Sequence, residues 1–357
     1  MGPGADSGRS WQVTRAAFVT PALACAIIVV AAIAAEVVAR RPVVRGALLA
    51  PSVGSPSRGF ELQLESLERF ASRADGKVDC IVLGNSTALM GVDPEAVSRA
   101  YREKSGGDLR CFNFGVGGLT ASAAAAVAPI LVRRYRPSLL IYVITARDVA
   151  QNAEGPLLAS TPWVEYAHGQ FSLSGWLVEH SAAYRYCLLY RQWLDPARWP
   201  AAQSEGGRTA EGFLPSRLRL ALSPALWAHT QAAFAKTAAQ PVSLAELAGF
   251  ASVLDLATMG IDVLVVEAPL HERVRSLAEH DGGFTAEAMT SLRLAARERG
   301  IEFWRFPRRE EIPAEGWTDF VHLNHSGASV FSAWLGERLA AAMQSGRLAP
   351  LPDPPQT

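Results

Sequence analysis

Three polar side chains have the types and the local spacing of a hydrolytic triad. Ser86 directly follows a short apolar run, residues 78–83, and Asp319 stands three residues before His322. A serine hydroxyl is a good nucleophile only when a base removes its proton, and a histidine oriented by a carboxylate is such a base. The chain therefore carries the groups for nucleophilic attack by a serine, if the fold brings them together.

An alternation of strands and helices is predicted to position these groups. Short apolar runs indicate the strands, and apolar residues at helical spacing, with caps or glycines at their ends, indicate the helices. The strands are expected at residues 78–83, 109–114, 138–144, 261–268 and 301–306, and the helices at 60–74, 94–104, 120–134, 243–259, 285–300 and 326–343. Because the connections are short, we predict an α/β fold with a doubly wound, mostly parallel five-stranded sheet.

In such a sheet the carboxyl ends of the parallel strands share one edge, where ligands bind. Ser86 follows the first strand, and His322 lies between the last strand and the last helix, so both are expected at that edge. Taken alone, Asp-x-x-His is a weak motif, whose ordinary alternative is an aspartate that caps a turn beside a surface histidine. The prediction depends on its combination with Gly84-Asn85-Ser86.

Composition excludes several other functions. The 357 residues include 34 basic and 34 acidic side chains, so no net charge attracts nucleic acid. Cys80 and Cys111 are expected to be buried free thiols, and the cysteine spacing favours neither a zinc site nor a disulfide framework. His322 and His325 have no third ligand close in sequence, and the glycines at 115–118 lack the pattern of a dinucleotide loop. We therefore expect no metal and no cofactor.

The N-terminal part of the chain is expected to meet a membrane. About twenty uncharged residues, 16–35, are long enough to span a bilayer as a helix. Arginines flank both ends, so the positive-inside rule does not fix the orientation, and a cleavable signal peptide is the alternative. We predict a single-pass protein of the cell membrane with its main domain outside the cytoplasm. The expected parts are a cytoplasmic tail at 1–15, a transmembrane helix at 16–40, a linker at 41–59, the main domain at 60–346 and a loose tail at 347–357.

Regular alternation lapses between residues 151 and 241. Tryptophans occur there among helical fragments and Pro/Gly breaks, which indicates a helical insertion. Two interpretations remain open for it. The insertion is either a lid over the site or a packing layer.

Together these blocks resemble the SGNH/GDSL hydrolase superfamily, whose fold is flavodoxin-like. Its members carry Gly-Asp-Ser after strand one, a glycine after strand two, an asparagine after strand three and Asp-x-x-His near the C-terminus. Here Asn85 stands where aspartate is commoner. The resemblance implies that Ser86 is the nucleophile, His322 the base and Asp319 its partner, and that the N–H groups of Ser86 and Gly118 form the oxyanion hole.

The membrane-anchored branch of the superfamily is the most similar. It includes the D-alanyl-lipoteichoic-acid transfer and alginate O-acetylation proteins, and this chain shares with it an N-terminal anchor, residues 91–94 after the serine, and residues 322–324. The resemblance implies an acyl ester of a cell-envelope glycan as substrate. For the transfer reaction it also implies a membrane-bound O-acyltransferase as partner. Asn85, Asn324 and His271 are expected to bind substrate.

Arg147 departs from the family pattern. The chain has Ala146-Arg147-Asp148 where Asn-Asp is expected after the third strand. Loss of one oxyanion donor typically costs about 10²–10³ in rate. Arg147 is therefore either a replacement donor to the oxyanion or to an anionic glycan, or one half of a structural ion pair. Together with Asn85 it supports an alternative function, a non-catalytic SGNH-fold module that binds glycan or scaffolds an envelope complex.

Overall fold

Five parallel strands form the centre of the body. Their order across the sheet is β2-β1-β3-β4-β5, and every neighbouring pair is parallel. The strands are β1 (Cys80–Gly84), β2 (Cys111–Gly115), β3 (Leu139–Ile144), β4 (Asp262–Glu267) and β5 (Glu302–Arg305). This order is that of doubly wound, flavodoxin-like sheets. The predicted fold class is confirmed.

The structure is a computed structural model of the whole chain. It describes residues 9–41, 43–44, 51–73, 77–150, 158, 160–194, 207–281, 283–307 and 311–350.

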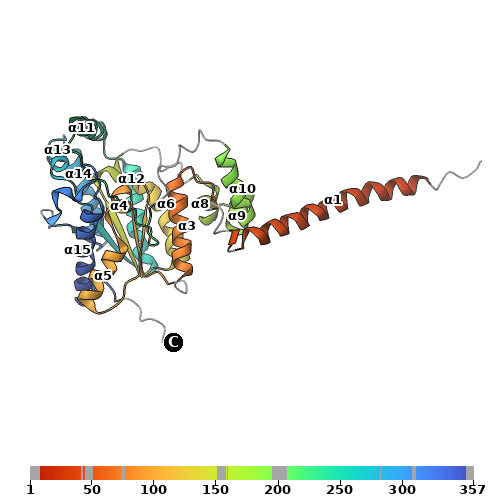
Figure 1. Cartoon of the computed structure of the whole chain (residues 1–357), viewed down its shortest axis with the longest axis horizontal. Coiled ribbons are helices and arrows are strands. Elements are labelled where there is room, and N and C mark those ends of the chain that lie inside the picture. The colour runs from red at the N-terminus through yellow and green to blue at the C-terminus, as the bar shows by residue number, and fades with distance from the viewer. Residues whose placement is uncertain are drawn as a thin grey trace, which may run out of the picture.

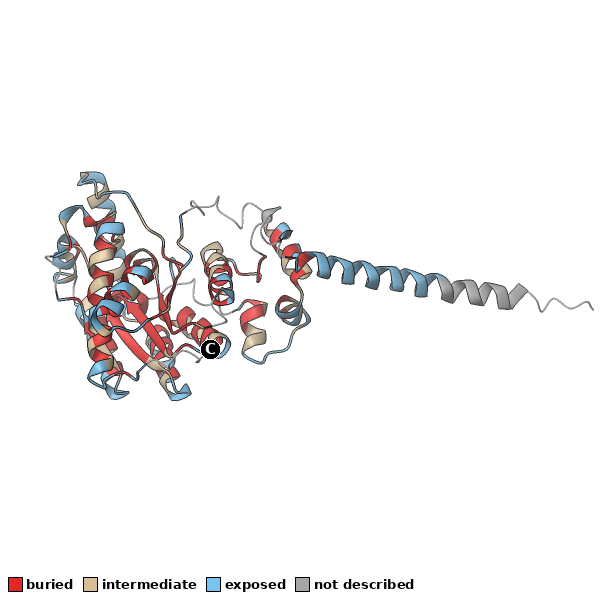
Figure 2. Cartoon of the chain, turned by 60° about the horizontal axis from the view of Figure 1, so that its bottom comes forward, coloured by how far each residue is buried: buried red, intermediate tan, exposed pale blue. Residues whose placement is uncertain are grey.

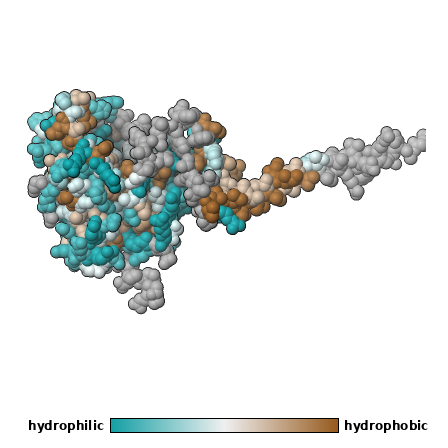
Figure 3. Space-filling view, in the orientation of Figure 1, coloured by the Kyte–Doolittle hydropathy of each residue, from teal (hydrophilic) through white to brown (hydrophobic). Residues whose placement is uncertain are grey.

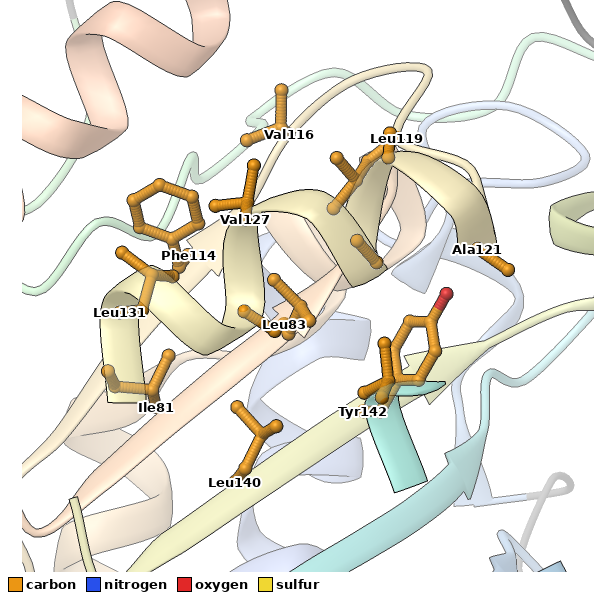
Figure 4. Packing of buried hydrophobic residues seen from close by; sticks show 14 of the residues in the cluster. Ile81, Leu83, Phe114, Val116, Leu119, Ala121, Val127, Leu131, Leu140 and Tyr142 are labelled. Atoms are coloured by element: carbon orange, nitrogen blue, oxygen red, sulfur yellow. The ribbon is translucent and has the colours of Figure 1, made fainter. Parts of the chain in front are cut away.

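Helices cover both faces of the sheet, and the strands between them are buried (Figure 2). One face carries α5 (Pro94–Ser105) and α15 (His325–Gln344). The other carries α3 (Arg58–Ser72), α6 (Ala121–Tyr135), α12 (Leu244–Leu254) and α14 (Phe284–Glu298). Successive strand residues point to opposite faces. Ile81 and Leu83 of β1 therefore join Val127 and Leu131 of α6 in one cluster (Figure 4), while Val82 joins the other.

The two buried cysteines lie side by side in the sheet. Cys80 of β1 is in register with Cys111 of β2, and both thiols are free. The expectation of buried free thiols is therefore confirmed.

A long helix, α1 (Arg9–Ala39), extends away from the body (Figure 1). Its stretch Thr20–Ala39 is long and apolar enough to cross a membrane, by length and composition. The surface of this stretch is mostly apolar (Figure 3). Of the predicted cytoplasmic tail, residues 1–8 lie outside the described residues and residues 9–15 belong to α1.

Residues 51–57 of the predicted linker pack onto the body. These residues are mostly buried and pack against α3, because the Glu61 carboxylate accepts hydrogen bonds from the Ser52 hydroxyl (2.7 Å) and from the N–H groups of Val53 (2.9 Å) and Ser55 (2.8 Å). Burial raises the pKa of Glu61, although these hydrogen bonds and the positive charge of Arg185 act to lower it. This segment therefore belongs to the body.

The predicted loose tail is likewise attached at its start. Leu348 is buried, and the N–H of Ala349 donates to Asp262 Oδ2 at 2.6 Å. Residues 351–357 lie outside the described residues.

The insertion divides into two helical parts. Helices α8 (Pro162–Ala167), α9 (Leu173–His180) and α10 (Ala182–Trp193) lie between the sheet and α1, whereas α11 (Pro224–Ala238) lies at the other end of the body, where α14 also lies (Figure 1). Residues 207–223 contain no helix or strand, and they are joined to the body by backbone hydrogen bonds such as Leu214 N–H to Leu89 O at 3.0 Å. Residues 151–157 and 195–206 of the insertion lie outside the described residues.

Candidate active site

The three side chains predicted from the sequence form one continuous hydrogen-bonded line. His322 Nε2 lies 2.8 Å from Ser86 Oγ, and His322 Nδ1 lies 2.8 Å from Asp319 Oδ2. One ring nitrogen thus faces the hydroxyl and the other faces the carboxylate. With the proton on Nδ1, the ring accepts the serine proton at Nε2, which is the geometry of a serine nucleophile with its general base.

Ser86 is the first residue of α4 (Ser86–Gly91), a short helix that begins where β1 ends. The sequence pattern did not reveal this helix. The turn from β1 into α4 requires a glycine at position 84. The φ of Gly84 is +156°, and a Cβ atom there would collide with the carbonyl oxygen of Val143. The tight turn between β1 and α4 holds the serine at the carboxyl edge of the sheet.

Asp319 organises its own loop as well as the histidine. Its Oδ1 accepts hydrogen bonds from the N–H groups of Val321 (2.7 Å) and His322 (2.8 Å), while Oδ2 faces the ring. Burial alone would raise the pKa of Asp319, but the hydrogen bond and charge of His322 and these two N–H groups lower it below its ordinary value. The carboxylate is therefore ionised at neutral pH and holds the imidazole in one orientation.

The predicted oxyanion donors line the same cavity as the serine. Gly118 follows β2 with φ +76°, and within the described chain no acceptor is found for its N–H or for that of Ser86. Both N–H groups are therefore available to a ligand. Their distance from a bound oxyanion stays a prediction.

Arg147 lies in the 3₁₀ turn η1 (Ala146–Val149), is exposed, and also lines the cavity. Among the described residues no hydrogen bond or ion pair joins its guanidinium to another side chain. The ion-pair alternative is thus not seen as a direct contact in the described part of the chain, although the Arg147 charge does help to lower the pKa of Asp148. Its role as a donor to substrate stays a prediction.

Asp148 is a buried carboxylate beside Asn85, the residue that precedes the nucleophile. Sequence reasoning did not assign Asp148 to the site. Asn85 Nδ2 lies 3.0 Å from each of its oxygens, and Thr145 donates to Oδ2 from both its N–H and its hydroxyl at 2.7 Å. Burial raises the pKa of Asp148 to about 6, against the opposing effects of these hydrogen bonds and of the Arg147 charge. The available signal was its position directly after Arg147, in the third family block.

Asn85 is held from both ends. While its amide nitrogen faces Asp148, its Oδ1 caps α4 by accepting hydrogen bonds from the N–H (2.7 Å) and the hydroxyl (2.8 Å) of Thr87. Asn85 lines the cavity, as expected of a substrate-binding residue. Its contacts in the structure, however, are those of a positioning residue for Ser86.

Asn324 does not line the cavity at Ser86, and its predicted role in substrate binding stays a prediction. It is buried and caps α15, with Oδ1 accepting from the N–H groups of Ser326 (3.0 Å) and Gly327 (3.3 Å). Its amide donates to the carbonyl oxygens of Leu218 (3.1 Å) and Glu315 (2.5 Å). Donor and acceptor are both satisfied within the fold, so Asn324 anchors the loop that carries the histidine.

His271 is also placed outside the cavity. It caps α13 (Glu272–Ala278), with Nδ1 accepting from Arg273 N–H at 3.2 Å, and its ring packs edge-on against Trp317 and Phe320 with centroids 5.3 Å apart in each case. Burial, and then the charge of Arg273, lower its pKa. The histidine therefore supports the 317–323 loop and lines a neighbouring groove.

The cavity at Ser86 and His322 has a volume of about 210 Å³. Two helices outside the motifs also line it: α14, which corresponds to the helix predicted at 285–300, and α11, which lies within the predicted insertion. Its apolar lining comes mainly from Leu119, Phe234, Leu270, Phe284, Met289 and Val321. Among the described residues, no group of three or more His, Cys, Asp and Glu side chains is arranged to hold a metal ion. The α11 part of the insertion thus lies over the site, whereas α8–α10 do not line it.

Comparisons with known proteins were made for the whole chain. No protein-family model matches it, and no curated protein matches it. The lipase/acylhydrolase from Enterococcus faecalis is 12% identical at a TM-score of 0.36, and the match covers 77% of this chain and 100% of that one. A GDSL-like lipase from Parabacteroides merdae is 12% identical at a TM-score of 0.38, with coverages of 74% and 97%. The inhibitor-bound aryl esterase of M. smegmatis is 13% identical at 0.35, with coverages of 75% and 99%.

At these low identities and TM-scores, the argument for chemistry rests on the geometry of Ser86, His322 and Asp319. The resemblance to the SGNH/GDSL hydrolase superfamily rests on the sequence blocks around Ser86, Gly118 and His322.

Proposed function

We propose that the chain is a membrane-anchored, extracytoplasmic serine esterase or O-acyltransferase of SGNH type that acts on acyl esters of a cell-envelope glycan. The observation that carries the proposal is the 2.8 Å contact of His322 Nε2 with Ser86 Oγ, on a ring held by Asp319. The alternative to an enzyme is a binding module, and a binding site does not require a base aligned on a hydroxyl.

The reaction follows from the positions of these groups. Ser86 Oγ attacks the ester carbonyl carbon while His322 takes the hydroxyl proton, and the oxyanion that forms is stabilised by the N–H groups of Ser86 and Gly118. Collapse of this intermediate breaks the bond to the alcohol oxygen, which receives the proton from His322. Water or a sugar hydroxyl then attacks the acyl-enzyme by the same steps in reverse. Hydrolysis and transfer therefore differ only in the second nucleophile.

The cavity supports an acyl group as the part of the substrate bound deepest. Its volume of about 210 Å³ exceeds that of an apolar protein cavity of roughly 150 Å³ that accommodates benzene. Apolar side chains dominate its lining, so burying an alkyl chain there is favourable by the hydrophobic effect. We therefore expect acyl groups longer than acetyl to be accepted.

The position of the cavity supports a polymer as the rest of the substrate. Helices α11 and α14, which line the cavity, lie at the end of the body away from α1 (Figure 1). If α1 crosses the membrane, the site faces the envelope and not the lipid surface.

The test is hydrolysis of esters by the full chain in detergent micelles. p-Nitrophenyl esters from acetate to octanoate vary the acyl chain, and an acylated envelope glycan supplies the proposed substrate, with added sugar acceptor to detect transfer. Ser86→Ala is expected to abolish turnover. Ser252→Ala, at an exposed serine of α12, is the matched control and is expected to retain it. Turnover that survives in Ser86→Ala would contradict the proposal.

One observation favours the second candidate, a non-catalytic glycan-binding or scaffolding module. Arg147 stands where the resembling family has its asparagine donor. Under this alternative the wild-type chain binds glycan and no ester is hydrolysed at any chain length. Binding of an acylated glycan by the wild type and Ser86→Ala alike, without turnover, would establish it.

A further inference from the structure

The hairpin formed by α9 and α10, residues 171–194, carries exposed apolar side chains at the base of α1. We propose that this α9–α10 hairpin lies in the membrane interface and holds the body in a fixed orientation on the lipid surface. The inference rests on the anchoring role of α1 in the proposed function. It does not depend on the catalytic reaction.

The end of α1 is fastened to the start of α10. Glu36 accepts hydrogen bonds from the Ser181 hydroxyl (2.8 Å) and from the N–H groups of Ala182 (3.0 Å) and Ala183 (3.1 Å), the first residues of α10 and its cap. Arg40 donates to the carbonyl oxygen of His180 at 2.8 Å. These contacts bind the hairpin to the helix more specifically than a flexible tether would.

Apolar packing reinforces this junction. Ala39 of α1 is buried in a small cluster with Ala182, Tyr186 and Leu189 of α10. Figure 1 shows α10 lying across the end of α1. A helix placed in this way at the end of a membrane-spanning segment lies along the membrane surface.

The hairpin exposes several large apolar side chains. Phe171 is 76% exposed, Leu173 66% and Trp176 42% at the α9 end, and Tyr190 (51%) and Leu194 (76%) are exposed at the far end of α10. An exposed apolar surface of this kind marks an interaction site.

Ring contacts connect this surface to the anchor. The Trp176 ring lies 5.2 Å from that of His180, whose carbonyl oxygen Arg40 holds, and the Phe171 ring lies 6.4 Å from Tyr166. The Tyr166 ring in turn packs against His180 at 6.1 Å. The aromatic side chains therefore gather around the point where the apolar stretch Thr20–Ala39 ends.

A lipid surface is the partner that fits these observations. Trp and Tyr are enriched where a membrane span meets the headgroups, and helices at that level bury their apolar side about 5–10 Å into the headgroup boundary. The α1 anchor brings this level of the bilayer to the hairpin without a further binding event. Arg41 and Arg191 are exposed nearby and suit anionic headgroups.

The experiment measures lipid contact at single thiols in the full chain, reconstituted in vesicles of phosphatidylcholine with phosphatidylglycerol. Cys80 and Cys111 are buried, so Cys25→Ser with Cys187→Ser leaves no exposed native thiol. Leu173→Cys and, separately, Phe171→Cys then carry a fluorescent label that lipids brominated near the headgroup quench. Leu294→Cys on α14, an apolar residue with 53% exposure at the other end of the body, is the matched control.

Severalfold stronger lipid quenching at Leu173→Cys and Phe171→Cys than at Leu294→Cys is expected. Glu36→Ala, which removes the junction with α10, is expected to reduce that quenching. Equal quenching at the three positions would overturn the proposal. Labels shielded from both brominated lipid and aqueous iodide would also overturn it, and would assign the surface to a protein partner or a second copy.

Native Cys25, retained alone on α1, separates this inference from the anchoring proposal. It is exposed within the apolar stretch, so a label there is expected to be strongly quenched by lipids brominated deep in the acyl chain. Quenching at Cys25 without quenching at the hairpin refutes only the hairpin inference. No quenching at Cys25 refutes the anchor, and with it both proposals.

Discussion

Replacing Asn85 by aspartate, the residue more common at this position in the resembling superfamily, is expected to destabilise the fold. The reason is Asp148. Its buried carboxylate faces the Asn85 amide, which lies 3.0 Å from both of its oxygens. Asn85→Asp removes this donor and puts a second carboxylate in its place.

The magnitude follows from two contributions. A lost hydrogen bond to a charged group costs about 1.5–3 kcal/mol. Two unit charges roughly 4 Å apart repel by about 4 kcal/mol at an effective dielectric constant of 20. Protonation of one carboxyl relieves part of the repulsion, so we expect the free energy of unfolding to fall by about 3–5 kcal/mol at pH 8.

The loss is expected to depend on pH with a defined sign. Burial already raises the pKa of Asp148 to about 6, and a second carboxylate would raise it further. The folded variant then retains a proton that the unfolded chain releases, which stabilises it as the pH falls, by about 1.4 kcal/mol per pH unit for one proton. Between pH 8 and pH 5 the deficit relative to the wild type should shrink by about 1–3 kcal/mol.

Urea unfolding of the full chain in micelles, followed by tryptophan fluorescence at both pH values, measures this deficit. Asn85→Ser is the matched control, because it keeps a capping oxygen, loses the amide and adds no charge. Its deficit should change much less with pH. An Asn85→Asp variant as stable as the wild type at pH 8, or equally destabilised at both pH values, would refute the contact between Asn85 and Asp148.

Three further substitutions probe the site. Arg147→Ala is expected to lower kcat by about 10²–10³ if the guanidinium donates to the oxyanion, with Arg147→Asn retaining more activity; unchanged turnover in both would exclude that role. Asp319→Asn is expected to lower kcat by about 10³–10⁴ with little change in melting temperature, because the ring loses its orienting carboxylate, and a loss below tenfold would argue against the triad. Asn324→Ala removes a helix cap and the donor to two loop carbonyls, so unfolding should become easier by about 1–3 kcal/mol in a urea titration. A wild-type urea midpoint would show that the cap is dispensable.

Local patterns were sufficient to predict most of the fold. The strands of the sheet are short apolar runs that helices cover on both faces, so their length and apolar composition identified them. The start of α5 was recognisable because Asp93 caps it and Pro94 occupies its first turn. The shared edge of a parallel sheet then predicted that Ser86 and His322 would meet.

The remaining features depend on contacts between distant residues. Glu61 looks like a solvated residue in the first turn of a helix, yet it is buried because three donors from residues 52–55 converge on it. Asn324 looks in the sequence like a polar residue available to substrate. In the folded chain its amide donates instead to the carbonyl oxygens of two residues, Leu218, which is distant in sequence, and Glu315, which is nearby. The insertion has no regular hydrophobic period. The sequence therefore did not predict that α11 would line the site while α8–α10 would lie next to α1.

The position of His271 shows the limit of reasoning from topology. Its place just after β4 correctly puts it near the active edge of the sheet. The direction of its ring is decided by Trp317 and Phe320, which it packs against, and this direction takes it away from the cavity. Topology therefore predicted which loops meet and not which side chains face the ligand.

Labelling by a fluorophosphonate probe tests the central claim most directly, because the probe reacts covalently only with an activated serine. The purified full chain is incubated with the probe at neutral pH, and the modified peptide is identified by mass spectrometry. We predict a single adduct on Ser86 that is absent in Ser86→Ala, strongly reduced in His322→Ala and unchanged in Ser252→Ala. A well-folded wild-type chain that remains unlabelled, or one labelled at another serine, would contradict the proposal that Ser86, His322 and Asp319 form a working triad.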